Sequence, residues 1–338
     1  MSVIPTTLTT KVNRNHKLVV PIVVAIVLLA VVIYAYVQNP SVTQAVLSSM
    51  IRQSTPLILG ALCGILCERA GIVNIGIEGQ MLLSAFTAYM TNVWTGNLLL
   101  SVLVGALTGA LLGLLLAFMS VNLKLNQIIG GTVINILATG ITGFYYQVGM
   151  TTHGKLSSIA LGPLAKIPLI GPVLFDNPPI TYIAILLVFI TQIVLFHTTW
   201  GLRTRAVGEH PRAADTLGIN VFSTRYINTI AGGAIAGLAG AFLTLEAVGL
   251  FERNMTNGRG FVALAVMIFG KWNPLGAWLA ALLFGLANAV QTQLQFMGTT
   301  IPHQFIGMIP YVLTIVVVSG FVGRSRAPAA EGTPYEKE

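Results

Sequence analysis

Long apolar runs, each sufficient to cross a lipid bilayer as a helix, constrain this chain more than any other feature. A membrane-spanning helix needs about 20 mostly apolar residues. Seven uninterrupted runs of about this length lie near residues 18–37, 46–67, 98–119, 127–148, 180–198, 227–249 and 304–322. Only 8% of the residues are charged, against about 25% in a soluble domain. The sequence therefore predicts an all-α polytopic membrane protein.

Three less regular segments raise the expected number of spans to about ten. They are the interrupted segment 72–93, the short segment 259–271 and the segment 275–295. With the N terminus in the cytoplasm, ten crossings leave 13 of the 18 Lys and Arg residues inside and five outside. Because positive charge collects in cytoplasmic loops, we expect both termini to be cytoplasmic. Dropping 259–271 would send Lys271 and the C-terminal arginines outside.

These spans divide the chain into three parts. A cytoplasmic N-terminal segment, 1–17, precedes a transmembrane domain, 18–322, and a cytoplasmic tail, 323–338. The transmembrane domain includes an external loop at 149–179 and a cytoplasmic loop at 199–226. In the cytoplasmic loop, Pro211 can begin a helix and Gly218 can end it. We expect a short helix at 211–217, parallel to the membrane surface.

The segment GIVNIGIEGQ, residues 71–80, interrupts an otherwise apolar stretch with glycines and polar side chains. Non-helical backbone at membrane depth is tolerated only inside protein or beside a cavity, so we expect a broken helix there. Asn74 can cap the helix that follows. Because a charge in the bilayer is costly, we expect Glu78 to line a solute pathway, to have a structural partner such as Arg69 or helix-end amides, or to do both.

A possible inverted repeat relates spans two to five to spans seven to ten. Each half carries an interrupted or short segment second in order, 72–93 and 259–271. Paired broken segments in inverted repeats indicate a transport pathway near the bilayer midplane. In the second half, the amides of Asn288, Gln291 and Gln295 share one helix face and suit a neutral polar solute.

The span 227–249 has small residues at four-residue spacing. These are Gly232, Ala236 and Gly240 on one row and Gly233, Gly237 and Ala241 on the next. Small residues allow membrane helices to approach closely. We interpret this stripe as a packing surface.

Catalytic and metal sites are not indicated. GMTTHGK, residues 149–155, matches part of a phosphate-binding loop, but Leu156 stands where Ser or Thr would bind Mg2+. The histidines are scattered, and Cys63 and Cys67 lack further ligands nearby, so we interpret them as buried small hydrophobes. The basic residues lie in membrane-flanking loops, so we expect no nucleic-acid partner.

Three ordered motifs give the chain a family resemblance. ERAGIVNIGIEGQMLLSAF (68–86), GLRTRAVGEHPRAADTLGIN (201–220) and GRGFVALAVMIFGKWNPLGA (258–277) resemble the membrane permeases of ATP-binding-cassette (ABC) importers. The group includes ribose and branched-chain amino acid permeases, and the likeness is greatest to the nucleoside type. The resemblance covers about residues 50–320 and implies a plasma-membrane protein of a prokaryote that works by alternating access.

The resemblance also implies partners and site residues. A cytoplasmic ATPase would bind ATP and Mg2+, with no cofactor in this chain, and a coupling helix would dock onto that ATPase. The matching residues are Gly208, Glu209, His210, Pro211, Ala213, Ala214, Gly218 and Ile219. A second permease in a heterodimer and an external substrate-binding lipoprotein are further expected partners. We expect Asn74, Glu78, Phe261, Asn288 and Gln291 near the pathway, with Phe261 able to stack on a base or sugar.

Other functions are not excluded by the sequence. An ABC permease for a simple sugar or a branched-chain amino acid is the principal alternative. An ion-coupled secondary transporter would share the broken helices, but it would usually need paired carboxylates at depth, which this chain does not offer. A channel lacks a recognisable filter motif, and a structural scaffold would not need Glu78.

Overall fold

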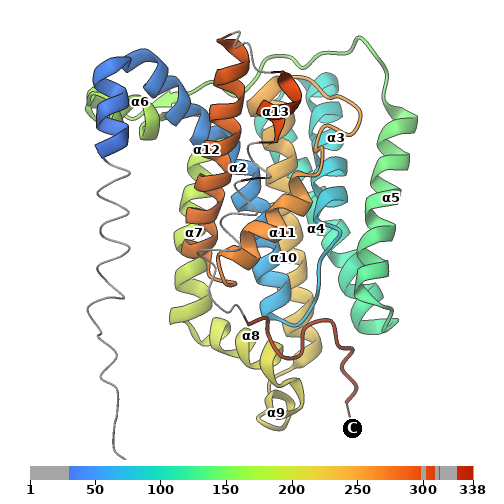
Figure 1. Cartoon of the computed structure of the whole chain (residues 1–338). Helices are drawn as coiled ribbons and strands as arrows, with labels where there is room; N and C mark the ends of the chain where they lie inside the picture. The colour runs from blue at the N-terminus through green and yellow to red at the C-terminus, as the bar shows by residue number, and fades with distance from the viewer. Residues whose placement is uncertain (1–29, 298–301, 309–311, 313–325, 338) are drawn as a thin grey trace, which may run out of the picture. The chain divides into compact units, whose positions relative to one another are not determined.

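The computed structural model describes residues 30–297, 302–308, 312 and 326–337 (Figure 1). The chain divides into two compact units, 1–45 and 46–338. In the first unit, residues 30–37 are helical and the helix α2, Pro40–Arg69, begins. The predicted spans 18–37 and 304–322 lie largely outside the described residues.

The second unit is almost entirely helical. After α2 come α3, Ile77–Thr95, α4, Leu98–Ala117, and α5, Gln127–Tyr145, with a π-helical turn η1, Phe118–Asn122, extending α4. A long connection follows. It contains the strands β1, Ile159–Ala160, and β2, Asp176–Asn177, which pair antiparallel, together with the 3-10 helix η2, Gly162–Lys166, and the short helix α6, Ile170–Leu174.

The later helices are α7, Pro179–His197, α8, Thr199–Glu209, and α9, Pro211–Thr216. Helix α10, Val221–Ala241, continues as the π-helix η3, Phe242–Val248. They are followed by α11, Arg259–Phe269, α12, Pro274–Phe296, and α13, His303–Gly307. The predicted short helix is present at α9, and Gly218 ends its turn with a φ of +79°.

Six described helices are long and apolar enough to cross a membrane: α2, α4 with η1, α5, α7, α10 with η3, and α12. The chain is therefore a multi-pass α-helical membrane protein. Helix α3 occupies the predicted segment 72–93 and α11 the predicted segment 259–271, with 11 residues. The expected total of about ten spans stays a prediction.

Helices α2 and α10 form the interior of the second unit. In their most apolar stretches, 83% of α2 and 72% of α10 are buried, against 28–33% for α4, α5, α7 and α12. The outer helices therefore present much of their apolar surface to the surroundings. In water such a surface would be unfavourable, but in lipid it is not.

Small residues bring α10 into close contact with α4. A Cβ atom on Gly109 would lie 2.2 Å from the Gly233 carbonyl oxygen, and one on Gly237 would lie 2.4 Å from the Gly105 carbonyl oxygen. On the neighbouring row, a Cβ on Gly240 would lie 2.2 Å from the Met81 oxygen in α3. The predicted packing surface is confirmed, and its main partner is a second glycine stripe at residues 105, 109 and 113 of α4.

Candidate functional site

The broken segment before α3 is held in place by side chains from α5. The Val73 amide donates to Gln127 Oε1 at 2.6 Å, and Asn135 Nδ2 donates to the Ile75 oxygen at 3.1 Å. Asn135 Oδ1 also accepts from the Gly79 amide at 2.7 Å. Two α5 side chains thus satisfy backbone groups that leave the helical pattern at membrane depth.

Glycines in the broken segment allow α5 to approach it. A Cβ on Gly79 would lie 2.7 Å from the Asn135 Cα, and a Cβ on Gly131 of α5 would lie 2.7 Å from the Gly76 amide nitrogen. The unusual glycine content of this segment is therefore a consequence of backbone-to-backbone packing. Gly71 has a different role, because its φ of +87° turns the chain after α2.

Asn74 lies inside the protein and does not cap α3. Its side chain is fully buried and contacts Cys63, Cys67 and Gln80. Helix α3 begins after Gly76 without a side-chain cap. The prediction that Asn74 caps this helix is wrong, because the side chain is directed back toward α2.

Glu78 joins the two interrupted segments of the chain. Its Oε1 accepts from the Gly258 amide at 2.8 Å and its Oε2 from the Gly260 amide at 2.6 Å. These amides form the N-terminus of α11, where free N–H groups and the helix dipole favour a negative charge. Of the structural partners considered from the sequence, helix-end amides are the ones that Glu78 contacts. Arg69 instead donates to the Trp272 carbonyl oxygen at 3.1 Å.

A second buried carboxylate, Glu246, accepts hydrogen bonds from the amides at the start of α7. Its Oε2 accepts from the Ile180 amide at 2.8 Å, and its Oε1 accepts from the Thr181 amide and hydroxyl. Glu246 stands in η3, the π-helical end of α10. Glu78 therefore caps α11, which comes much later in the sequence, and Glu246 caps α7, which comes much earlier.

A polar cavity of about 320 Å³ lies between α2, α11 and α12. Asn288, Gln291 and Thr292 line it from α12, Gln53 from α2, and Asn257 and Arg259 from the start of α11. Apolar residues Leu57, Val262 and Phe284 and the backbone of Gly307 complete the wall. The cavity combines apolar surface with several amides and one guanidinium, which is typical of a site for a polar small molecule.

Arg259 and Gln53 also line a neighbouring cavity of about 540 Å³. Its other charged lining residues are Arg52, Lys155 and Glu246. Arg259 is half-buried, and its Nη1 donates to the Met255 oxygen at 2.9 Å. It therefore stands where the two cavities meet.

The predicted pathway residues fall in different environments. Asn288 and Gln291 line the polar cavity. Asn74 and Glu78 are buried and hydrogen-bonded and do not line it, and the Phe261 side chain is 49% exposed on α11 and does not line it either. Sequence reasoning missed Gln53, Asn257 and Arg259. A polar Gln53 within an apolar span was the available signal.

The predicted coupling residues surround α9 at the opposite end of the second unit from α13 (Figure 1). Glu209, His210, Ala213 and Gly218 are exposed, and Pro211 and Ile219 are half-buried. Gly208 and Ala214 are buried; a Cβ on Gly208 would lie 2.2 Å from the Arg69 oxygen. The exposed face also carries Leu217, which is 81% exposed and was not predicted.

No group of three potential metal ligands from His, Cys, Asp and Glu occurs in the part of the chain that the structure describes. Apolar spanning helices, buried helix-capping carboxylates and a polar cavity together define a multi-pass membrane protein with a site suited to a polar small molecule.

Comparison with known proteins identifies its family. Residues 46–318 match the family described as branched-chain amino acid transport system / permease component, and the chain belongs to this family. It is a permease subunit of an ABC transporter and not an enzyme, since ATP hydrolysis lies in a separate subunit.

Three relatives are similar over nearly their whole length. The nucleoside ABC transporter permease protein NupC of Lactococcus lactis subsp. cremoris is 40% identical, covering 87% of this chain and 97% of the relative. The guanosine ABC transporter permease protein NupQ of Bacillus subtilis is 39% identical, covering 84% and 94%. The putative glucose ABC transporter permease protein TsgC13 of Haloferax volcanii is 33% identical, covering 88% and 99%. No solved structure matches the chain.

Proposed function

We propose that this chain forms the translocation pathway for nucleosides in an ABC importer and works by alternating access. The observation that carries the proposal is the cavity lined by Gln53, Asn288 and Gln291 together with Arg259. A nucleoside presents hydroxyl groups and a base edge with several donors and acceptors. Neutral amides can pair with both kinds of group, and a guanidinium can donate two parallel hydrogen bonds to a base.

Simple sugars are the second candidate. The two relatives named for nucleosides are 40% and 39% identical, whereas the relative named for glucose is 33% identical. This order favours a nucleoside. A branched-chain amino acid fits the cavity less well, because the wall formed by the described residues combines amides with Arg259 and has no acidic side chain for the ammonium group.

We further propose that α9 is the coupling helix that docks onto the ATPase. Its outward face carries Ala213, which is small, and Leu217, which is apolar and largely exposed. A small residue lets a partner approach closely, and an exposed leucine can fill a pocket on it. The ATPase would bind ATP and Mg2+, and its closure would push α9 and rock the permease.

The assembly that we propose contains a second permease, the ATPase and an external substrate-binding lipoprotein, in a prokaryotic plasma membrane. The α9 end would face the cytoplasm, as would both termini. The loops and helix ends at the α9 end carry Arg69, Lys124, Arg203, Arg205 and Arg212, whereas the loops 146–178 and 249–258 at the other end carry Lys155, Lys166 and Arg253. This distribution follows the positive-inside rule.

The first experiment is uptake of radiolabelled uridine, guanosine and ribose by cells that express the chain with these partners. Ala213→Glu places a charge on the docking face, where the native side chain is exposed, so it should abolish uptake at unchanged membrane abundance. Ribose uptake without nucleoside uptake would overturn the proposal that the substrate is a nucleoside. Normal uptake by Ala213→Glu would overturn the role of α9.

Cavity variants test the pathway itself. Asn288→Leu and Gln291→Leu remove hydrogen-bonding groups from the cavity wall, whereas Gln295→Leu makes the same type of change at an exposed position of α12. We expect the first two to reduce transport efficiency roughly tenfold, since an unpaired polar contact costs about 1–3 kcal/mol. Gln295→Leu should resemble the native chain. Equal behaviour of all three would exclude this cavity as the pathway.

A further inference from the structure

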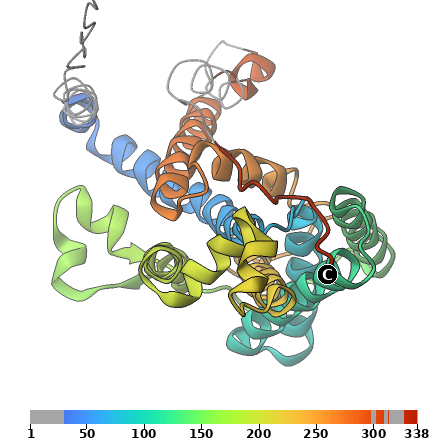
Figure 2. The same ribbon diagram turned by 90° about the horizontal axis from the view of Figure 1, so that it is seen from below.

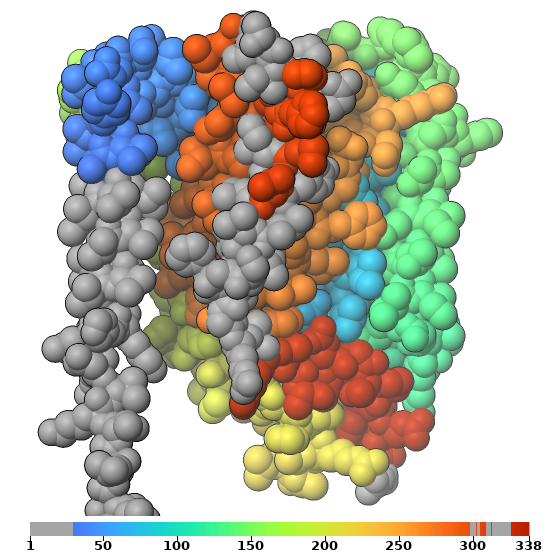
Figure 3. All heavy atoms as spheres, in the orientation of Figure 1, coloured from blue at the N-terminus to red at the C-terminus, as the bar shows by residue number. Residues whose placement is uncertain are grey.

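We infer that the C-terminal residues 326–337 act as a clamp that positions α9 on the permease during ATP-driven transport. The inference rests on the proposed function of α9 as the coupling helix. In Figure 3 the C-terminal clamp, in red, lies against the residues of α8 and α9, in yellow. Seen from this end in Figure 2, it crosses beneath the helices toward the connection between α4 and α5.

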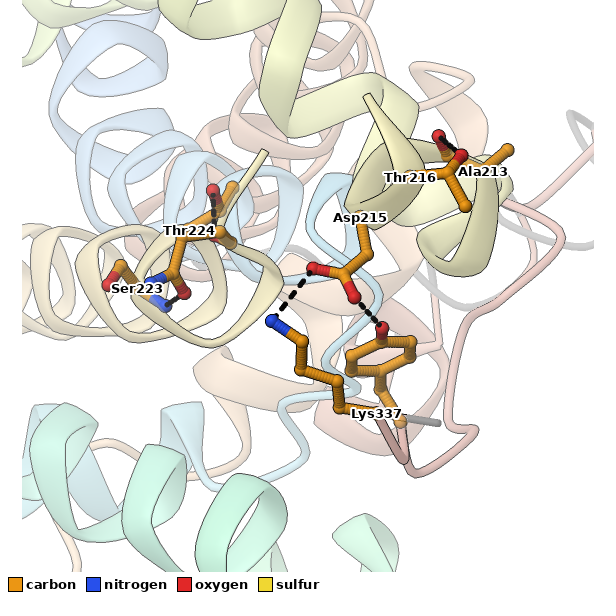
Figure 4. Close-up of polar contacts among 8 residues, drawn as sticks. Ala213, Asp215, Thr216, Ser223, Thr224 and Lys337 are labelled. Atoms are coloured by element: carbon orange, nitrogen blue, oxygen red, sulfur yellow. Dashed lines mark hydrogen bonds and ion pairs between the residues drawn. The ribbon is translucent and has the colours of Figure 1, made fainter. Parts of the chain in front are cut away.

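The clamp contacts the acidic side chain of Asp215 in α9. The Tyr335 hydroxyl donates to Asp215 Oδ2 at 2.8 Å, and Lys337 Nζ lies 3.7 Å from Asp215 Oδ1. Figure 4 shows the Asp215 carboxylate facing Lys337. The Lys337 side chain is largely exposed, so this ion pair contributes little. The hydrogen bond from Tyr335 is the more specific contact.

Tyr335 also makes apolar contacts with the buried side of α9. Its side chain is only 6% exposed and belongs to a small cluster with Val207, Ala214 and Val221. Its ring packs against Phe222, with 5.6 Å between the ring centroids. Ala214 is a buried residue of α9, so this helix packs against residues of α8, α10 and the clamp.

The rest of the clamp is attached to the body of the permease. The Ala330 amide donates to the Gly208 oxygen at 2.9 Å, and the Gly332 amide donates to the Gly71 oxygen at 3.2 Å. At the far end, Lys124 Nζ lies 2.6 Å from Glu336 Oε1. The clamp therefore ties the end of α8 to the turn after α2 and to the connection between α4 and α5.

A buried arginine gives the clamp a second anchor. Arg225 of α10 is 1% exposed, and its Nη1 donates to the Thr333 oxygen at 3.1 Å. Its Nε and Nη2 have no hydrogen-bond partner among the described residues. A buried guanidinium needs acceptors, so the Thr333 carbonyl favours the attached state of the clamp.

Helix α9 needs such support because of its size. It has six residues, and isolated helices shorter than about 12–15 residues are marginal in water. A force applied to α9 by an ATPase would otherwise distort the helix instead of moving α10 and α2. Tyr335 and Asp215 are therefore positioning residues, which act through α9 and not on the solute.

The test uses the complete importer in proteoliposomes and measures solute transported per ATP hydrolysed. Tyr335→Phe removes the hydroxyl and keeps the ring, and Tyr145→Phe makes the same change at an exposed site at the end of α5. We expect Tyr335→Phe to lower the ratio roughly two- to tenfold, as expected for one lost hydrogen bond. Tyr145→Phe should leave it unchanged.

Conservative rescue separates positioning from general destabilisation. Asp215→Asn keeps an oxygen that can accept from Tyr335 and should stay near the native ratio, whereas Asp215→Ala should resemble Tyr335→Phe. A spin label on Thr216→Cys should become more mobile in Asp215→Ala and Tyr335→Phe and not in Asp215→Asn. Native ratios and native label mobility in both Tyr335→Phe and Asp215→Ala would overturn the inference.

Ala213→Glu, measured in the same vesicles, distinguishes this inference from the proposed function. If Ala213→Glu transports normally, α9 is not the coupling helix, and both proposals fall. If Ala213→Glu is inactive but the Tyr335 and Asp215 variants are native-like, only the clamp is overturned.

Discussion

Glu78 and Gly260, 182 residues apart in the sequence, are joined by a 2.6 Å hydrogen bond from the Gly260 amide to the Glu78 carboxylate. A Cβ on Gly260 would lie 2.5 Å from the Glu78 amide nitrogen, so the contact depends on glycine there. The bond connects the broken segment before α3 to the start of α11. It fixes the relative position of the two segments that the sequence singled out as interrupted.

Removing the Glu78 carboxylate should destabilise the permease. Glu78→Ala removes the carboxylate that accepts from the Gly258 and Gly260 amides. We expect the free energy of unfolding to fall by about 1–3 kcal/mol or more. Glu78→Gln keeps one acceptor oxygen and should cost less. Thermal unfolding of the detergent-purified protein measures both. Glu252→Ala, an exposed change in the loop before α11, is the control, and an unfolding temperature for Glu78→Ala equal to that of the control would contradict the cap.

The close contact between α4 and α10 makes a second prediction. Gly109→Ala places a methyl group 2.2 Å from the Gly233 oxygen and should cost about 1–3 kcal/mol, as overpacking does. Gly140→Ala in α5 meets no atom within 4 Å and should be neutral or slightly stabilising, because alanine favours helix. Comparing their unfolding temperatures tests the packing, and equal values would contradict a contact too close for an added methyl group.

Leu217 provides a test of the docking face. Its side chain is 81% exposed at the end of α9, so Leu217→Asp should leave the free energy of unfolding within about 0.5 kcal/mol of the native value. Transport should nevertheless fall at least tenfold if Leu217 fills an ATPase pocket. Leu164→Asp, an exposed change in η2, serves as control. Parallel measurements of uptake and of ATPase co-purification would reveal a docking role, and native values in both would argue against it.

Attachment of the C-terminal clamp should depend on pH. Burial raises the pKa of the Glu331 carboxyl, and the hydrogen bond with Glu68 of α2, the titratable side chain that contacts it, offsets part of this rise. A raised pKa means that the attached state prefers the protonated form of Glu331. The contribution of Glu331 to the stability of the attached state is therefore complete at low pH and is lost as pH rises through the raised pKa. Glu331→Gln should remove the part of the pH dependence that comes from Glu331.

Glu336 acts in the opposite sense at the end of the clamp. The hydrogen bond and the charge of Lys124 lower the pKa of the Glu336 carboxyl, so its contribution is present above the ordinary pKa and is lost in acid. The mobility of a spin label on Ala329→Cys, followed from about pH 3 to pH 9, measures the opposing contributions of Glu336 in acid and Glu331 at higher pH. An identical pH profile in Glu331→Gln and the native chain would rule out a contribution from Glu331.

The sequence by itself determined the features that depend on neighbouring residues. Apolar runs of sufficient length specify helices for lipid, Pro211 and Gly218 delimit α9, and the small residues of α10 specify a close packing surface. The face shared by Asn288 and Gln291 also follows from helix periodicity. These properties depend on composition and spacing within one segment.

Only the tertiary structure decided which segments meet. Asn74 could have capped α3, but Cys63 and Cys67 lie within its reach, while Gln127 and Asn135 of α5 satisfy the broken backbone. Glu78 could have had several structural partners, and it is the N-terminus of α11 that lies beside it. A polar side chain in a membrane protein must find a partner because lipid offers none, and the identity of that partner is set by packing between segments distant in sequence.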